Sequence, residues 1–96
     1  MIMSNKSLYL VQSNFSTTPS VLTKLQQVYS PEDTIVLMGE SVLQLQHPFL
    51  QPLDKVYVLD TDAEILAGQT TDNLQLISYA EFADICLNYT RCIRLN

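Results

Sequence analysis

The sequence has no tryptophan, two glycines, two cysteines and one histidine among 96 residues, so groups that carry out chemistry are scarce. Neither a Walker loop nor a dinucleotide-binding fingerprint is found, and with two glycines in all we expect no loop that cradles phosphates. The five residues between Cys86 and Cys92 fit no standard zinc spacing, and His47 alone cannot complete a zinc site. No nucleophilic serine elbow is present. The sequence therefore predicts no cofactor and no metal.

Positive charge is also scarce. Five lysines and arginines stand against ten aspartates and glutamates, which gives a formal charge of −5. Nucleic-acid binding relies on clustered cations that neutralise phosphates, so we expect no direct contact with RNA or DNA. No run approaches the roughly eighteen apolar residues of a membrane span, and the first residues lack the apolar core of a secretion signal. We therefore expect a cytoplasmic chain without a membrane segment, whose cysteines are reduced.

Apolar surface, in contrast, is plentiful. Hydrophobic residues make up 47% of the chain and charged residues only 16%, against about a quarter in typical domains. A chain of this length builds one core, so we expect a single domain over residues 1–96. Such a small globule has few polar groups with which to cover itself. This shortage predicts that partner subunits cover part of the surface.

Short apolar runs recur along the chain and are rich in valine, isoleucine and tyrosine. Runs of this length that are apolar on both faces are typical of buried parallel strands. The terminal residues add a possible last strand, with Ile93 and Leu95 on one face. The predicted strands are Ser7–Val11, Thr34–Met38, Val56–Leu59, Leu74–Ile77 and, last, Cys92–Asn96.

Helical patterns separate these strands. Thr18 is expected to cap a first helix, with Pro19 at its first position. Ser78 and Glu81 have the spacing of a capping box at the start of another helix. A short helix is expected at Ser41–Gln46. The apolar faces comprise Val21, Leu22, Leu25, Val28 and Tyr29 in the first helix, and Phe82, Ile85, Cys86 and Tyr89 in the helix after Ser78.

Alternation of strands and helices predicts an α/β fold. We expect three layers, in which a mostly parallel sheet of four or five strands has helices on both faces.

Three carboxylates, Asp60, Asp62 and Glu64, follow the third predicted strand at every second position. The pattern fails as a calcium loop, because Ile65 stands where that loop needs glycine and Thr71 where it needs glutamate. Thr61 and Glu64 instead have capping-box spacing, and Asp62 falls in a first helical turn, where the helix dipole favours negative charge. We interpret the segment as the start of a short helix of about six residues, which Gly68 ends.

The landmarks between Lys55 and Leu87 follow a recognisable order, namely a strand, Asp62, a short helix, Gly68, a strand, and the pair Tyr79 and Phe82. This order resembles the C-terminal half of the DsrH/TusB family of sulfur-relay subunits. The first half of the chain agrees more loosely, so the resemblance extends over nearly the whole sequence.

The chain also departs from that family at three places. Members usually carry arginine where this sequence has Ala67, and Asp-Gly where it has Glu40 and Ser41. They tend to end in an aromatic residue, usually tryptophan, whereas this chain ends in Asn96.

The resemblance implies a DsrEFH-like fold and a heterohexamer with TusC/DsrF-like and TusD/DsrE-like subunits. Such a complex passes persulfide sulfur between sulfur-carrier proteins, and its reactive cysteine lies chiefly on the TusD/DsrE-type subunit. In TusBCD complexes the sulfur becomes the 2-thio group of wobble uridine in tRNA, whereas DsrEFH complexes serve the oxidation of stored sulfur. DsrH-type members often have a cysteine in or near the first helix. This helix has none here, which favours a TusB-like, non-catalytic subunit.

Two alternatives stay open. In the first, the chain is a DsrH-like subunit of a sulfur-oxidation complex with a reactive cysteine. Cys92 is then the candidate, because Arg91 and Arg94 flank it and nearby cations favour the thiolate, whereas Cys86 falls on the apolar stripe of its helix and is expected to be an inert core thiol. In the second, the chain is a small-ligand-binding domain with Asp60 at the carboxyl end of a strand. His47, which precedes a proline, is expected to pack in a loop.

Overall fold

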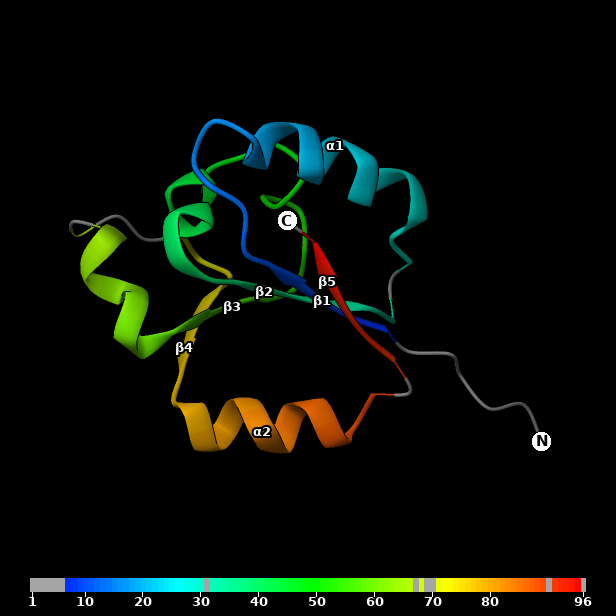
Figure 1. Ribbon diagram of the computed structural model, residues 1–96, viewed down its shortest axis with the longest axis vertical. Coiled ribbons are helices and arrows are strands. Elements are labelled where there is room, and N and C mark those ends of the chain that lie inside the picture. The colour runs from blue at the N-terminus through cyan, green and yellow to red at the C-terminus, as the bar shows by residue number, and fades with distance from the viewer. Residues whose placement is uncertain (1–6, 31, 67, 69–70, 90, 96) are drawn as a thin grey trace.

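The computed structural model describes residues 7–30, 32–66, 68, 71–89 and 91–95. Five strands of this part of the chain form one sheet in the order β4-β3-β2-β1-β5, and every neighbouring pair is parallel. Helix α1 lies on one face of the sheet and helix α2 on the other (Figure 1). The predicted three-layer α/β fold is therefore confirmed. The strands are β1 (Ser7–Val11), β2 (Thr34–Leu37), β3 (Val56–Leu59), β4 (Leu74–Ile77) and β5 (Arg91–Leu95), and the α-helices are α1 (Thr18–Val28) and α2 (Tyr79–Leu87).

The strand positions agree closely with the apolar runs of the sequence. The terminal strand begins at Arg91, one residue earlier than expected, and pairs with β1. Because β1 is the first strand and lies inside the sheet, Val11 is paired with Leu37 on one side and with Leu95 on the other. The last strand is thus hydrogen-bonded to the first, and β4 and β5 form the two edges of the sheet.

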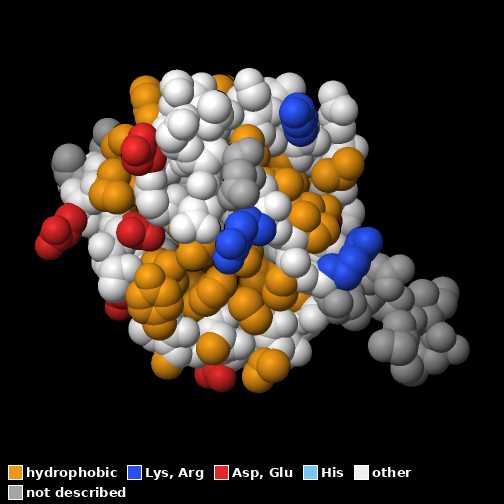
Figure 2. All heavy atoms as spheres, in the orientation of Figure 1, with side chains coloured by type: hydrophobic (Ala, Val, Ile, Leu, Met, Phe, Trp, Pro, Cys, Tyr) orange, Lys and Arg blue, Asp and Glu red, His pale blue; other side chains and the backbone are white. Residues whose placement is uncertain are grey.

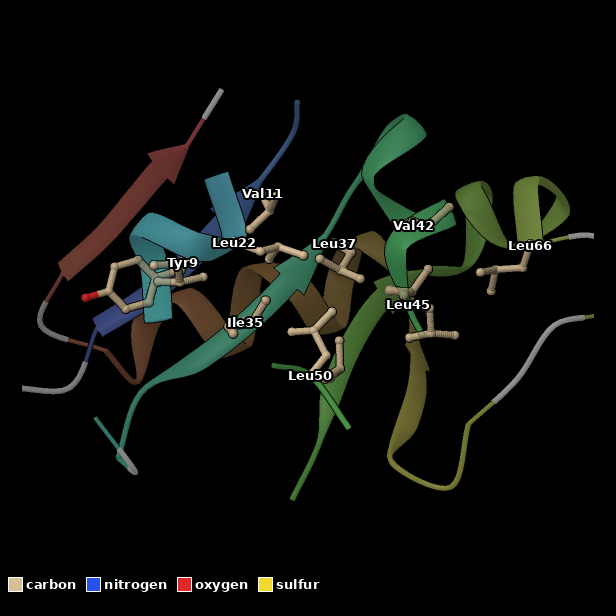
Figure 3. Packing of buried hydrophobic residues seen from close by; sticks show 12 residues of the cluster. Tyr9, Val11, Leu22, Ile35, Leu37, Val42, Leu45, Leu50 and Leu66 are labelled. Carbon is tan, nitrogen blue, oxygen red and sulfur yellow. The ribbon is translucent and has the colours of Figure 1, made fainter. Parts of the chain in front are cut away.

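The core lies mainly between α1 and the sheet, as Figure 3 shows. Leu22 and Leu25 of α1 are buried there beside the strand residues of one face. Full burial of one such side chain contributes about 1.5 to 3 kcal/mol, so this layer supplies most of the apolar stabilisation. The cluster comprises Tyr9, Val11, Leu22, Leu25, Ile35, Leu37, Val42, Leu45, Leu50, Val56, Val58 and Leu66.

The predictions for the ends of α1 were wrong in two respects. Thr17 occupies the cap position without a side-chain capping bond, and Thr18 is already helical. The Thr18 hydroxyl is fully buried and hydrogen-bonds to the Ser13 hydroxyl, at 2.7 Å, and to the carbonyl of Asn14, at 2.6 Å. Thr18, which was expected to cap the helix, therefore links the preceding loop to the core instead. At the other end Val28, predicted on the apolar face, is 63% exposed.

Two short 3-10 helices, η1 (Gly39–Gln44) and η2 (Asp60–Leu66), replace the two short helices expected from the sequence. The first begins two residues before the predicted Ser41–Gln46, because Gly39 adopts a left-handed φ of 60° directly after β2. The buried Ser41 hydroxyl then lies 2.7 Å from the carbonyl of Val11 and accepts the backbone N–H of Met38 at 3.0 Å. These bonds hold η1 against the ends of β1 and β2.

Helix α2 begins as predicted, with the capping box in place. The Ser78 hydroxyl accepts the Glu81 N–H at 3.1 Å, and the Glu81 carboxylate accepts the Ser78 N–H at 2.9 Å. No residue of this helix is buried. Its apolar stripe, including Phe82 and Ile85, is only half-buried against the sheet.

The sheet face beneath α2 has buried residues of its own. Side chains alternate between the two faces of a strand, so the strand residues that alternate with those of the α1-side cluster point towards α2. Four of these are no more than 2% exposed: Leu8, Val36, Leu59 and Ile77. One nine-residue helix nevertheless covers little of a five-stranded sheet, and Figure 2 shows hydrophobic side chains gathered at the surface over α2 and the sheet beside it.

Candidate functional site

The carboxylates that follow β3 hold neighbouring backbone in place. Asp62 is partly buried, and its Oδ2 accepts the N–H of Gly39 at 3.1 Å, which links η2 to η1. The predicted Thr61 and Glu64 capping box is wrong, because the segment is a 3-10 helix that begins at Asp60. Gly68 has a φ of 85°, as expected of a residue that follows a helix, while Ala67 lies outside the described residues. No cluster of metal-binding side chains occurs among the residues that the structure describes.

Two surface hollows lie at the amino ends of strands. Ligands of open α/β sheets bind beyond the carboxyl ends instead, where Asp60 lies exposed. A hollow of about 180 Å³ precedes β2 and β3, and a shallower one of about 480 Å³ precedes β4. The first is lined by Tyr29, Glu32, Asp33, Thr34, Asp54, Lys55, Tyr57 and Tyr89, and the second by Gln46, Gln51, Leu53, Asp54, Thr71, Asp72 and Asn73.

Tyr29 lines the smaller hollow. Burial in the first place, and then the charges of Asp33 and Asp54 and the neighbouring Tyr89, raise its pKa above the usual value of 10.0. Its hydroxyl donates to the backbone carbonyl of Asp33 at 3.0 Å, and its ring contacts Phe49 edge to face with centroids 5.5 Å apart. Tyr29 is therefore held as a neutral phenol with a structural role.

His47 lies in the turns that follow η1, and it is half-buried. Its Nδ1 accepts the backbone N–H of Phe49 at 3.1 Å, and its carbonyl accepts the N–H of Leu50 at 2.9 Å. Through these bonds His47 shapes the loop, and its position in a loop agrees with the prediction from the sequence.

The two cysteines meet between α2 and β5. Cys92 is exposed, and its Sγ lies 3.9 Å from the carbonyl oxygen of Cys86, towards which its thiol points as a weak donor. Cys86 is half-buried, where the sequence predicted a core thiol. Burial in the first place, and then a hydrogen bond with the Cys92 side chain, raise the pKa of the Cys86 thiol above 9.0. The site is thus a pair of neighbouring thiols, one half-buried and the other open to solvent.

Sequence reasoning treated these cysteines separately and missed their contact. Two sequence patterns bear on this contact. The helical pattern puts Cys86 on the stripe that faces the sheet. In the sheet, Cys92 is paired with Leu8, whose side chain points towards α2. What the sequence lacked was the position of β5, which runs beside β1 and so returns the chain beneath α2. Arg91 and Arg94, on either side of Cys92, are both exposed.

Comparison with known proteins decides the family. The family model described as "DsrH like protein" matches residues 13–92, which is most of the chain. The chain belongs to the DsrH-like family. No curated protein matches this DsrH-like chain significantly. The family membership makes it a subunit of a sulfur-relay system that works in a complex with DsrE- and DsrF-like partners.

The described part of this DsrH-like chain contains no helix with the length and apolar character needed to cross a membrane. Its longest helix, α1, has 11 residues and is amphipathic, with buried Leu22 and Leu25 and an exposed opposite side.

Proposed function

We propose that this DsrH-like chain is a non-catalytic subunit of a cytoplasmic TusBCD-type complex that supports persulfide transfer for 2-thiouridine formation at the tRNA wobble position. The position of its thiols carries the proposal. Helix α1, in or near which DsrH-type members often have a cysteine, has none, and the only cysteines of the sequence lie at α2 and β5. The reactive thiol of the complex is then supplied by a DsrE-like partner.

The exposed apolar surface supports a role in assembly. Tyr79 and Leu87 of α2 are 60% and 84% exposed, and Phe82 and Ile85 of the same helix are only half-buried. Large hydrophobic side chains left exposed along one helix of a small, charge-poor protein are typical of an interface. We propose that a DsrE- or DsrF-like chain covers the α2 face within a heterohexamer of two copies of each subunit.

The test measures 2-thiouridine in tRNA from cells that lack this protein. We expect wild-type protein to restore the modification, and a variant with both Cys86→Ser and Cys92→Ser to restore it equally, because the sulfur is carried by a partner's thiol. Co-purification with the DsrE- and DsrF-like chains is the control for assembly of the variant. Loss of the modification with an assembled double variant would refute the non-catalytic role.

The alternative function is that of a subunit of a DsrEFH-type sulfur-oxidation complex with a reactive cysteine. It rests on one observation, namely that the Cys92 thiol is exposed and so open to a persulfide donor. It predicts that cells without the protein keep their 2-thiouridine and lose the ability to oxidise stored sulfur. It also predicts a Cys92 persulfide, which mass spectrometry detects after incubation with a cysteine desulfurase and cysteine.

A further inference from the structure

Hydrogen bonds to the rest of the fold position both cysteines. Cys92 is paired with Leu8 inside the β1–β5 ladder. The carbonyl of Cys86 accepts the N–H of Tyr89 at 3.3 Å, and the Tyr89 hydroxyl hydrogen-bonds to the side chain of Thr34 in β2. Tyr89 is therefore anchored to the sheet, and the proximity of the two cysteines follows from the fold.

A disulfide needs sulfur atoms about 2.05 Å apart. Cys92 Sγ already lies 3.9 Å from the backbone carbonyl oxygen of Cys86. Rotation of the two side chains, together with an adjustment of α2, is the movement required, and no residue of α2 is buried to oppose that adjustment. The exposure of Cys92 gives a disulfide-containing reagent access from solvent.

We propose that Cys86 and Cys92 form a dithiol modification site, which takes up a reversible intrachain disulfide by exchange with a low-molecular-weight disulfide. This site goes beyond the proposed function and does not depend on it, because it requires no partner subunit and no persulfide.

The reaction proceeds in two exchange steps. The Cys92 thiolate attacks one sulfur of the small disulfide, the S–S bond of the reagent breaks, and one thiolate leaves. Cys86 loses its proton to water and attacks the Cys92 sulfur of the mixed disulfide, which forms the Cys86–Cys92 bond and expels the second thiolate. The two cysteines lose two electrons, and the reagent is reduced to two thiols.

The order of attack follows from the two environments. Cys92 is the attacking thiol because it is exposed, and Cys86 is the resolving thiol because it is half-buried beside Cys92. The raised pKa of Cys86 agrees with this order, since a protonated thiol is a poor first nucleophile.

The experiment incubates the full chain with oxidised glutathione at graded ratios to reduced glutathione, blocks free thiols with an alkylating reagent, and maps tryptic peptides by mass spectrometry. Trypsin cleaves after Arg91, between the two cysteines, so the disulfide joins the peptide of residues 56–91 to that of residues 92–94. We expect this linked pair in the oxidised protein and its loss on reduction. The same map of the chain co-purified with its partners gives the readout in the assembled state.

Single variants assign the two roles. Cys86→Ser is expected to accumulate a glutathione adduct on Cys92, because the resolving thiol is absent, whereas Cys92→Ser is expected to stay unmodified at Cys86. Circular dichroism confirms that each variant is folded. The proposal is wrong if wild-type protein accumulates a stable glutathione adduct without linked peptides, or if its cysteines link only to another chain. Equal adduct formation in the two variants would overturn the assigned order.

Discussion

Individual polar side chains hold the backbone at the amino end of the sheet. Asp33 is 7% exposed, and its carboxylate accepts the N–H of Ser7 at 2.9 Å and that of Ser30 at 3.0 Å. A buried carboxylate is stable only with such partners, because its desolvation is costly. Tyr29 donates to the backbone carbonyl of Asp33, so these residues fix the turn that leads from α1 into β2.

Tyr29 gives a pH dependence whose sign is determined by its raised pKa. Its pKa is higher in the folded protein than the usual value of 10.0, so the folded state holds the phenol proton more tightly than the unfolded state does. This stabilisation is fully present below pH 10 and is lost as the pH rises through the folded-state pKa. We expect the free energy of unfolding to fall above pH 10.

The variant Tyr29→Phe isolates this effect. It should lower the free energy of unfolding by about 1 kcal/mol at neutral pH, because the hydrogen bond to Asp33 is lost. Above pH 10 the difference from wild type should shrink. Urea unfolding of both proteins at neutral pH and above pH 10 measures it, and a constant difference would contradict the expected role of Tyr29.

At the scale of elements, Asp62 links the two 3-10 helices beyond the carboxyl ends of β2 and β3. The bond from Gly39 N–H to Asp62 Oδ2 connects segments that are 23 residues apart in the sequence. Nearby, Ser41 holds η1 to β1, so the end of β1 and the two 3-10 helices form one bonded unit. Asp62 is half-buried within that unit, whereas Glu64 of the same segment is exposed.

The variants Asp62→Ala and Glu64→Ala test the interpretation of the carboxylates. Asp62→Ala should lower the free energy of unfolding by about 1 to 2 kcal/mol, because the Gly39 N–H loses its partner. Glu64→Ala, the matched control, should change it by less than about 0.5 kcal/mol. Thermal unfolding with and without added calcium completes the test. Calcium that raised the Tm of wild type but not of Asp62→Ala would show a cation site instead.

At the scale of the whole molecule, the two faces of the sheet are covered unequally. The α1 face has the extensive core cluster, whereas α2 contributes no buried residue to the other face. The hydrophobic residues that remain exposed on α2 therefore add little to the stability of the isolated chain. We expect these residues to stabilise the complex, once a partner subunit covers them. Their substitution should therefore weaken assembly and leave the folding of the isolated chain almost unchanged.

Leu87→Ser tests this expectation, because Leu87 is 84% exposed. We expect a change of less than about 0.5 kcal/mol in the free energy of unfolding. In the complex, loss of an interface leucine should raise the dissociation constant by about tenfold or more. Val28→Ser is the control, since Val28 is 63% exposed on α1, which lies on the opposite face of the sheet. A larger effect on association from Val28 than from Leu87 would move the interface to the α1 face.

The local pattern of the sequence determined the strands, the start of α2 and the order of elements. Apolar runs specify buried strands because either face of such a run must leave water, and the bonds between Ser78 and Glu81 depend only on residues three apart. Those features need no knowledge of the rest of the chain. Family membership was predictable for the same reason, because its landmarks follow one another along the sequence.

Only the tertiary structure decided which groups of different segments meet. Thr18 turns inwards because Ser13 and Asn14 lie beside it, Asp62 bonds to Gly39 because β2 and β3 end side by side, and Cys86 meets Cys92 because β5 returns beside β1. Each of these contacts depends on the path of the chain between elements. That path is set by the burial of the whole sheet, which no short stretch of sequence contains.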